Sequence, residues 1–160
     1  MRTNPSRLAE LKRHMILDSS AEKAYDDIAK LLATSLEVPI AIVNFLDDDR
    51  DWFKSCIGLP LTQSPVATSF CETFFNTSED VIVVEDTRES TLFSQHPLVV
   101  GEPFVRFYAA ARLRVNGQTL GTLCAYDVQP RKISPDQIAQ LRTLTLAVVE
   151  LLAQRNAPAA

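Results

Sequence analysis

The sequence holds little material for several common kinds of functional site. Its 160 residues include four glycines, three cysteines and two histidines, and no apolar run approaches the roughly 20 residues that span a bilayer. So few glycines exclude a glycine-rich loop that cradles phosphate. The number of cysteines is odd and their spacing is irregular (Cys56, Cys71 and Cys124). This is typical of a protein in a reducing compartment rather than of a disulfide scaffold. We therefore expect a cytoplasmic protein with no membrane partner.

An excess of basic residues is also missing. Sixteen Lys and Arg residues stand against 20 Asp and Glu residues, for a formal net charge of −4, so no basic face predicts a nucleic-acid partner. Hydrophobic residues make up 46% and charged residues 22%, close to the average of soluble globular domains. A chain of this length buries enough apolar surface to fold as one domain over residues 1–160.

Three segments with apolar residues at helical spacing predict helices near the two ends of the chain. The first follows the cap Asn4 and Pro5 and ends at residues 16–18. The second begins at Ser19, which has capping-box spacing to Glu22, and ends before Pro39. The last begins with a second capping box at 134–137. Its apolar face is wide and includes Ile138, Leu141, Leu144, Val148, Leu151 and Leu152.

The middle of the chain predicts strands, because its apolar residues run continuously or alternate with polar ones. Residues 38–46 are nearly all β-branched or aromatic, as in a central strand, whereas 107–115 alternate strictly, as in a half-solvated one. Asn116-Gly117 is a strong hairpin signal. A short amphipathic helix is expected at 66–75. The expected strands lie at 38–46, 51–57, 81–84, 107–115 and 118–126, and their order predicts an α+β domain with a mostly antiparallel sheet.

Neither the acidic cluster nor the histidines have the spacing of a metal site. The aspartates of 47–51 lack the alternating ligands, the glycine and the distal glutamate of a calcium loop, which favours a solvated hairpin turn. No second ligand stands at a suitable spacing from His14 or His96, and we interpret both as surface residues. The sequence therefore predicts no bound metal.

The cysteines and the aromatic residues are the remaining candidates. Cys71 follows a predicted helix start, where a thiol pKa can be lowered, but buried or unreactive thiols are the favoured interpretation, and no Gly-x-Ser-x-Gly motif is present. Aromatic residues gather around the short helix and the start of the 107–115 strand. Two interpretations of this cluster remain: the rings line a small-molecule pocket, or they only fill the core between the helix and the sheet. The candidate ligand-binding residues are Phe70, Cys71, Asp86, Arg106, Phe107 and Tyr108. Strand alternation places Arg106 and Tyr108 on one face and Phe107 on the other, so either the strand bends at Ala109-Ala110 or one of these assignments is wrong.

Short motifs follow one another in order between residues 7 and 152. They are Arg7-Leu8, Ile16-Leu17-Asp18, Asp49-Arg50, Trp52-Phe53-Lys54-Ser55, Gly58-Leu59, Ser69-Phe70-Cys71, Val83-Val84 with Asp86, Phe93, Pro97-Leu98-Val99, Gly101, Arg106-Phe107-Tyr108-Ala109, Gly121-Thr122-Leu123-Cys124, Asp127, Pro130-Arg131, and Ser134 with Gln137. No single motif is specific, but the ordered set resembles the GAF domain. The resemblance is to the bacterial subgroup that precedes histidine kinase, diguanylate cyclase or phosphodiesterase modules.

This resemblance implies a six-stranded antiparallel sheet with terminal helices on one face and a ligand pocket on the other. Relatives bind cyclic nucleotides, chromophores, haem or small metabolites, but neither the cyclic-nucleotide signature nor a bilin attachment motif is present here. The ligand and any cofactor therefore stay unassigned. Ala110 and Arg112 replace the usual glycine and proline, which changes side-chain volume near the expected pocket.

The favoured function is a non-catalytic sensory or regulatory domain that binds a small molecule or a partner and relays a signal through its terminal helices. The alternatives are a cysteine-dependent reductase of free methionine sulfoxide and a ligand-free dimerisation module. The last helix has more apolar surface than one sheet covers, and Leu8, Leu11 and Met15 of the first helix add to it. We therefore expect a homodimer through the terminal helices, with a histidine kinase or cyclic-di-nucleotide output domain as the downstream partner.

Overall fold

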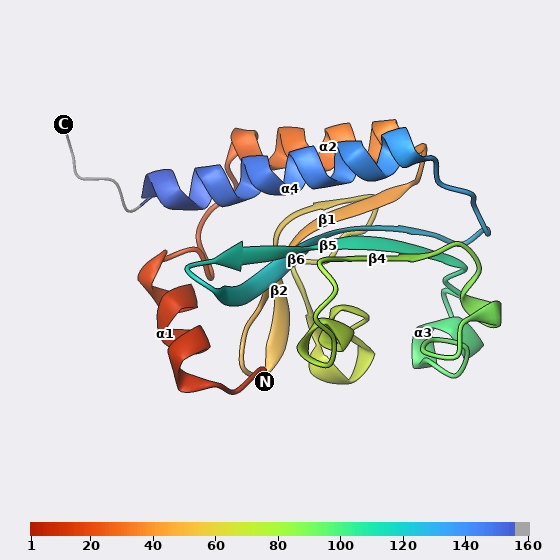
Figure 1. Cartoon of the computed structure of the whole chain (residues 1–160), viewed down its shortest axis with the longest axis horizontal. Coiled ribbons are helices and arrows are strands. Elements are labelled where there is room, and N and C mark those ends of the chain that lie inside the picture. The colour runs from red at the N-terminus through yellow and green to blue at the C-terminus, as the bar shows by residue number, and fades with distance from the viewer. Residues whose placement is uncertain (156–160) are drawn as a thin grey trace.

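Six antiparallel strands form one sheet in the order β3-β2-β1-β6-β5-β4. Figure 1 shows this sheet between its two layers of helices and turns. In this computed structural model, residues 1–155 are described; the predicted fraying tail at 156–160 lies outside them. The strands are β1 (Ile40–Leu46), β2 (Arg50–Ile57), β3 (Gln63–Pro65), β4 (Val81–Val84), β5 (Phe107–Val115) and β6 (Gln118–Asp127). The α+β class and the antiparallel sheet are thus confirmed.

Helices cover the sheet unequally on its two faces. The helices are α1 (Pro5–Arg13), α2 (Lys23–Leu36), α3 (Pro97–Val100) and α4 (Pro135–Arg155). Helices α2 and α4 lie side by side on one face, while α3 and the 3₁₀ turns Val66–Thr68, Cys71–Phe75 and Thr87–Glu89 lie over the other. Helix α1 lies at the end of the sheet beside the β5–β6 turn, where Asn116 donates to Glu10 over 2.8 Å.

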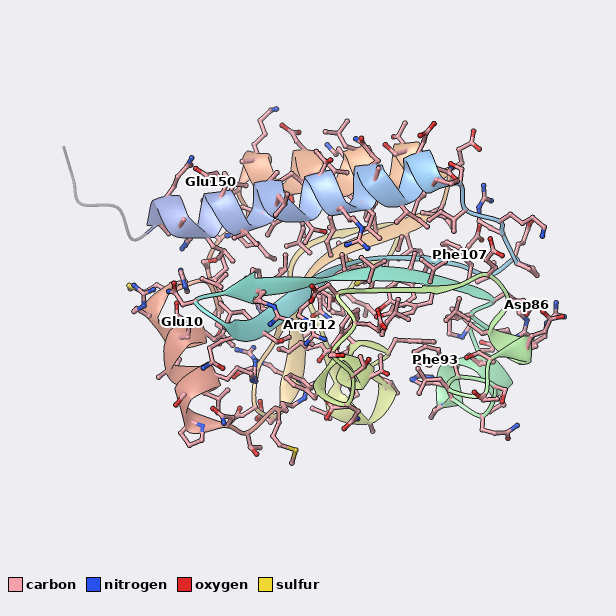
Figure 2. All side chains as sticks on the ribbon, viewed as in Figure 1. Glu10, Asp86, Phe93, Phe107, Arg112 and Glu150 are labelled. Atoms are coloured by element: carbon pink, nitrogen blue, oxygen red, sulfur yellow. The ribbon has the colours of Figure 1, made fainter. Side chains whose placement is uncertain are left out.

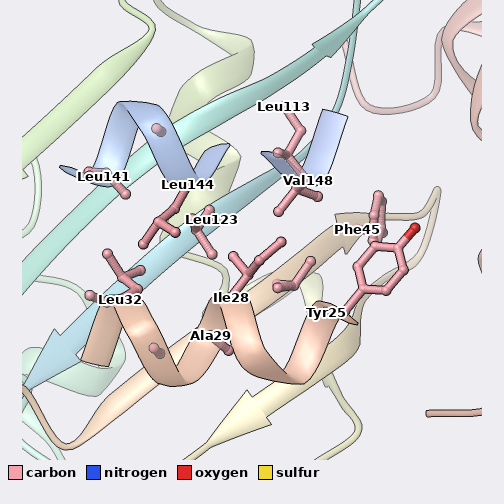
Figure 3. Packing of buried hydrophobic residues seen from close by; sticks show 14 of the residues in the cluster. Tyr25, Ile28, Ala29, Leu32, Phe45, Leu113, Leu123, Leu141, Leu144 and Val148 are labelled. Carbon is pink, nitrogen blue, oxygen red and sulfur yellow. The ribbon is translucent and has the colours of Figure 1, made fainter. Parts of the chain in front are cut away.

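The sheet separates two cores, because successive side chains of a strand point to opposite faces. The larger core packs α2 and α4 on the sheet through residues such as Leu32, Leu123 and Leu144 (Figure 3). The smaller core lies under the 3₁₀ turns and includes Phe70 and Tyr108. Both faces of β5 are therefore covered, and the expectation of a half-solvated strand is wrong.

Several local signals form as expected. Asn4 Oδ1 accepts the backbone N–H of Arg7. The capping box of α4 is complete, since Ser134 Oγ accepts the N–H of Gln137 and Gln137 Oε1 accepts that of Ser134. The Asn116 turn between β5 and β6 has the positive φ that this hairpin requires.

Other local expectations are corrected. Helix α1 ends at Arg13, and α2 begins after Glu22 without a side-chain cap, because Ser19 Oγ instead accepts a hydrogen bond from Lys54 at 2.8 Å. The expected helix at 66–75 is two 3₁₀ turns. The short strand β3 was not expected, because Gln63–Pro65 has no apolar alternation.

His14 and His96 are not surface residues. His14 is 2% exposed, with Nδ1 3.3 Å from the carbonyl of Leu152 and Nε2 3.1 Å from Glu10. His96 is half-buried and stacks on Phe70. Sequence spacing does not predict the burial of these side chains, because the His14–Leu152 contact joins the two ends of the chain and the His96–Phe70 contact joins a loop to the core. Among residues 1–155, no helix is long and apolar enough to cross a membrane.

Candidate functional site

A cavity of about 90 Å³ lies on the sheet face opposite α2 and α4. Strands β1, β2 and β6 form its floor, and the loops around the 3₁₀ turns and α3 form its cover. Most of the lining is apolar, with a few polar groups at one end. The lining residues are Ile40, Ile42, Asn44, Asp51, Phe53, Leu59, Leu61, Ser64, Thr68, Ser69, Phe70, Leu98, Pro103, Val105 and Tyr126. An apolar hollow with a few convergent polar groups is typical of small-molecule sites.

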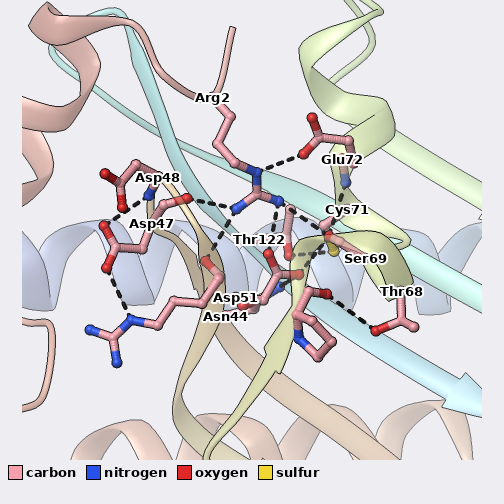
Figure 4. A network of polar contacts seen from close by, with 12 residues as sticks. Arg2, Asn44, Asp47, Asp48, Asp51, Thr68, Ser69, Cys71, Glu72 and Thr122 are labelled. Atoms are coloured by element: carbon pink, nitrogen blue, oxygen red, sulfur yellow. Dashed lines mark hydrogen bonds and ion pairs between the residues drawn. The ribbon is translucent and has the colours of Figure 1, made fainter.

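The polar end of the cavity is built around the carboxylate of Asp51, which is 3% exposed. Its Oδ2 accepts hydrogen bonds from Ser69 Oγ at 2.6 Å and from Asn44 Nδ2 at 3.2 Å, and its Oδ1 accepts from Arg2 Nη2 at 2.9 Å. Figure 4 shows this network. Asn44 Oδ1, by contrast, is buried with no hydrogen-bond partner among the residues described.

Arg2 ties the start of the chain to this network. Its guanidinium, 5% exposed, also donates to the carbonyls of Asp47 and Arg50 and to Glu72 Oε2. The carbonyl of Arg2 in turn accepts from Arg7, whose pKa is lowered to about 10 by burial and by the nearby Arg2 charge. The residues that precede α1 are therefore held against the polar end of the cavity.

The buried thiols lie behind the cavity. Cys71 Sγ is 3.1 Å from Tyr108 Oη and 3.0 Å from Thr122 Oγ1, and both Cys71 and Cys124 are fully covered. Burial raises the pKa of Cys124, Tyr108 and Tyr126 well above their ordinary values. Burial also raises the pKa of the Cys71 thiol, but hydrogen bonds with Cys124, Thr122 and Tyr108 outweigh this effect, so that the pKa is lowered. A thiol acts as a nucleophile only when it is also accessible, so the complete burial of Cys71 favours a structural role.

Phe70 closes one side of the cavity within an aromatic cluster. Its ring centroid is 4.0 Å from that of His96 and 5.2 Å from that of Tyr108. Burial lowers the pKa of His96, so its neutral form is favoured, and its Nδ1 accepts the N–H of Leu98. Together these contacts hold the loop that contains α3 over the sheet.

The structure brings only some of the predicted site residues together. Phe70 lines the cavity, and Cys71 and Tyr108 lie in the core behind it. Phe107 does not line the cavity, because its side chain points to the face of the sheet that α2 and α4 cover. Phe93 lies on the opposite face (Figure 2). The alternation of β5 requires this separation.

Asp86 and Arg106 also lie outside the cavity lining. Asp86 caps the 3₁₀ turn at 87–89 and pairs with Arg88 at 2.8 Å. Arg106 donates to the carbonyl of Val99 and lies over the Phe104 ring. Both side chains therefore stabilise the loops around the site, which corrects their assignment as lining residues.

The two departures from the subgroup pattern also lie elsewhere. Ala110 is buried in the smaller core. The Arg112 guanidinium donates to the carbonyls of Phe74, Thr77 and Glu79. Arg112 thus fixes the loop before β4, and neither side chain lines the cavity.

Asn44, Asp51, Ser69 and Arg2 were missed from the sequence. One signal was available, since Asn44 is the single polar residue in the otherwise apolar strand β1. The acidic turn that precedes Asp51 is a hairpin as expected: Asp47 accepts from Arg50 and from the N–H of Asp48.

Comparison with known proteins agrees with this geometry. The GAF domain family model matches residues 20–152, and domains of this family are typically sensory or regulatory. A cyclic di-GMP phosphodiesterase of Pseudomonas aeruginosa is 35% identical over 127 residues, which are 79% of this chain and 22% of that protein. The chain thus spans about a fifth of the length of this relative.

Two solved structures show the same fold. The GAF domain of an Acinetobacter phosphoenolpyruvate-protein phosphotransferase superposes with a TM-score of 0.69 at 18% identity, over 99% of each chain. A free methionine-R-sulfoxide reductase of Neisseria meningitidis superposes with a TM-score of 0.65 at 14% identity, over 93% of this chain and 87% of that one. The family match over most of the chain, with this sheet order and cavity, shows that the protein belongs to the GAF domain family.

Proposed function

We propose that this chain is a non-catalytic sensory domain that binds a small molecule in the cavity and relays binding through its terminal helices. The observation that carries the proposal is the composition of the cavity, whose apolar walls converge on Asn44, Asp51 and Ser69. Such a site offers burial to an apolar body and a few fixed hydrogen bonds for orientation. The related cyclic di-GMP phosphodiesterase supports a cyclic-di-nucleotide output domain as the partner, and a histidine kinase stays the alternative.

The position of Arg2 supports the proposed relay. This residue contacts Asp51, a cavity residue, and leads directly into α1. At the other end of α1, Arg155 of α4 donates to the carbonyls of His14 and Met15. A ligand at the polar end would therefore shift the connected contacts of Asn44, Asp51 and Arg2, and a resulting shift of α1 would reach the end of α4 through Arg155.

The burial of the thiols argues against the reductase alternative. Reduction of methionine sulfoxide needs an attacking thiolate and a resolving thiol that reach the substrate. Cys71 and Cys124 are fully covered, and Cys56 is half-buried on β2 with a pKa raised by burial. The likeness to the Neisseria reductase concerns the fold alone.

The proposal is tested by filling the cavity. Native mass spectrometry of freshly purified protein looks for a retained molecule, and ligand-observed NMR screens small metabolites against wild type. Val105→Phe places a ring in the cavity, while Val128→Phe makes the same change at a position that is 47% exposed. We expect binding to be lost in Val105→Phe and kept in Val128→Phe. Compounds that bind both variants alike, or a screen with no binders, contradict the proposal.

A further inference from the structure

The cavity contains one buried hydrogen-bond acceptor that the protein leaves unused. Asn44 is 1% exposed, and its Oδ1 has no partner among residues 1–155. Ile40, Ile42 and Asn44 alternate along β1 and line the cavity together. A buried polar atom without a hydrogen bond costs free energy comparable to a lost bond. The site is therefore completed by a group that donates a hydrogen bond.

The orientation of the Asn44 amide is fixed by its neighbour. Nδ2 donates to Asp51 Oδ2 at 3.2 Å. A carboxylate only accepts hydrogen bonds, so turning the amide over would place Oδ1 against Asp51 and lose this contact. Oδ1 is consequently the atom that remains for a ligand.

The charges around the cavity select against ions. Asp51 is balanced by Arg2 in a buried pair, with side chains 4% and 5% exposed. The guanidinium of Arg2 is already engaged by Asp47, Arg50, Asp51 and Glu72. An anion would meet a carboxylate and an amide oxygen with no donor of Arg2 to spare. A cation would lose its hydration without a free counter-charge.

The size of the cavity limits the ligand as well. An enclosed apolar cavity of roughly 150 Å³ accommodates benzene, whereas this one measures about 90 Å³. A short chain of a few non-hydrogen atoms therefore fits, and neither a substituted ring nor a nucleotide does.

We propose that the cavity binds a compact, uncharged molecule with an apolar body and one O–H or N–H group, which donates to Asn44 Oδ1. This inference rests on the proposed small-molecule function and names its ligand class. It separates this domain from any member of the fold that holds a phosphate or carboxylate in the corresponding cavity, since the polar end here presents acceptors.

Four fluorinated probes of similar shape test the ligand class by ¹⁹F NMR titration of the intact chain. They are 3-fluoropropan-1-ol (a neutral donor), 1-fluorobutane (no donor), 3-fluoropropanoate (an anion) and 3-fluoropropylamine (a cation at neutral pH). We expect 3-fluoropropan-1-ol to bind about tenfold more tightly than 1-fluorobutane, the effect of one buried hydrogen bond. The two ions should bind more weakly than 3-fluoropropan-1-ol.

Variants assign the effect to Asn44. Asn44→Leu removes the acceptor at nearly constant volume and should bring the affinity ratio of the alcohol to the fluoroalkane close to one. Asn76→Leu makes the same change at an exposed position outside the lining and should keep the wild-type ratio. If Asn44→Leu does not fold, the affinities of wild type for the four probes still test the ligand class.

Each outcome separates this inference from the proposed function. Equal affinities for 3-fluoropropan-1-ol and 1-fluorobutane overturn the donor class but leave small-molecule binding in place. Tighter binding of either ion overturns the requirement for a neutral ligand. If none of the four probes binds, the ligand class is wrong, and the Val105→Phe screen decides the proposed function independently.

Discussion

The guanidinium of Arg2 donates to the carboxylate of Asp51 over 2.9 Å, although the two residues are 49 positions apart. This contact joins the segment before α1 to the floor of the cavity. Because both side chains are buried, neither charge has water as an alternative partner. The pair therefore connects the stability of the domain to the position of its N-terminal helix.

Removal of Arg2 should destabilise the domain strongly. Arg2→Ala leaves Asp51 buried without its cation and frees the carbonyls of Asp47 and Arg50. Breaking one side of a buried ion pair costs about 3 to 5 kcal/mol. We expect a loss of this order in the free energy of unfolding, measured by urea denaturation followed by circular dichroism.

An exposed arginine provides the control for this measurement. Arg88 pairs with Asp86 at 2.8 Å, but its side chain is 56% exposed. Pairs of this kind contribute under about 1 kcal/mol, so Arg88→Ala should hardly change stability. If the two substitutions have equal effects, the pair at the cavity does not hold the N-terminal segment in place.

Glu10 should make the domain sensitive to acid. Hydrogen bonds from Arg13, and further ones from Asn116 and His14, lower its pKa from the ordinary value of 4.5 to about 2. A carboxyl whose pKa is lowered on folding contributes stability that is full above its unfolded value and is lost as the pH falls through the folded value. We expect this contribution to disappear between pH 4.5 and about 2.

Glu10→Gln tests this contribution directly. The variant should be less stable than wild type at neutral pH, and the difference should shrink as the pH falls towards 2, because the glutamine does not titrate. Glu150→Gln, at an exposed position of α4, is the control for loss of one negative charge. A difference between wild type and Glu10→Gln that is constant with pH would contradict the assignment.

The sequence predicted a structural feature correctly where the interacting residues lie close together in the chain and no distant residue competes for them. The capping box at Ser134 formed because both partners lie within one helical turn. The same pattern at Ser19 failed, because the ammonium group of Lys54 on β2 takes the hydroxyl. Strand alternation placed Phe107 and Tyr108 on opposite faces, which the two separate cores confirm.

The polar end of the site was beyond such patterns. Asn44 and Asp51 meet through the β1–β2 hairpin, whereas Ser69 and Arg2 come from a 3₁₀ segment and from the N-terminus. Composition and spacing carry no signal for contacts at these separations. Asn44 was detectable only as a polar residue within an apolar strand.

The homodimer stays a prediction, and the structure changes its test. Leu144 is buried against the α2 layer, so its substitution would unfold the monomer rather than separate two copies. Leu146, by contrast, is 69% exposed on α4. We expect wild type to sediment as a dimer at micromolar concentration and Leu146→Glu to sediment as a monomer.

A second exposed leucine makes this test specific. Leu31 is 51% exposed on the neighbouring helix α2, so Leu31→Glu adds the same charge to an adjacent surface and should leave the dimer intact. Wild type that stays monomeric at high micromolar concentration ends the dimer hypothesis. Dissociation by both variants would instead place the contact on the α2–α4 layer as a whole.

Thiol accessibility distinguishes the sensory domain from the reductase. Cys71 and Cys124 are fully covered and Cys56 is half-buried. The folded protein should therefore react with 5,5′-dithiobis(2-nitrobenzoate) at one thiol at most, while all three thiols react in guanidinium chloride.

The native protein should also reduce no free methionine sulfoxide when dithiothreitol is supplied, with the Neisseria reductase as positive control. Cys71→Ala should then leave the probe affinities unchanged, because the thiol lies behind the cavity and does not line it. Turnover by wild type that disappears in Cys71→Ala would show that the cover over this thiol opens and that the domain is an enzyme.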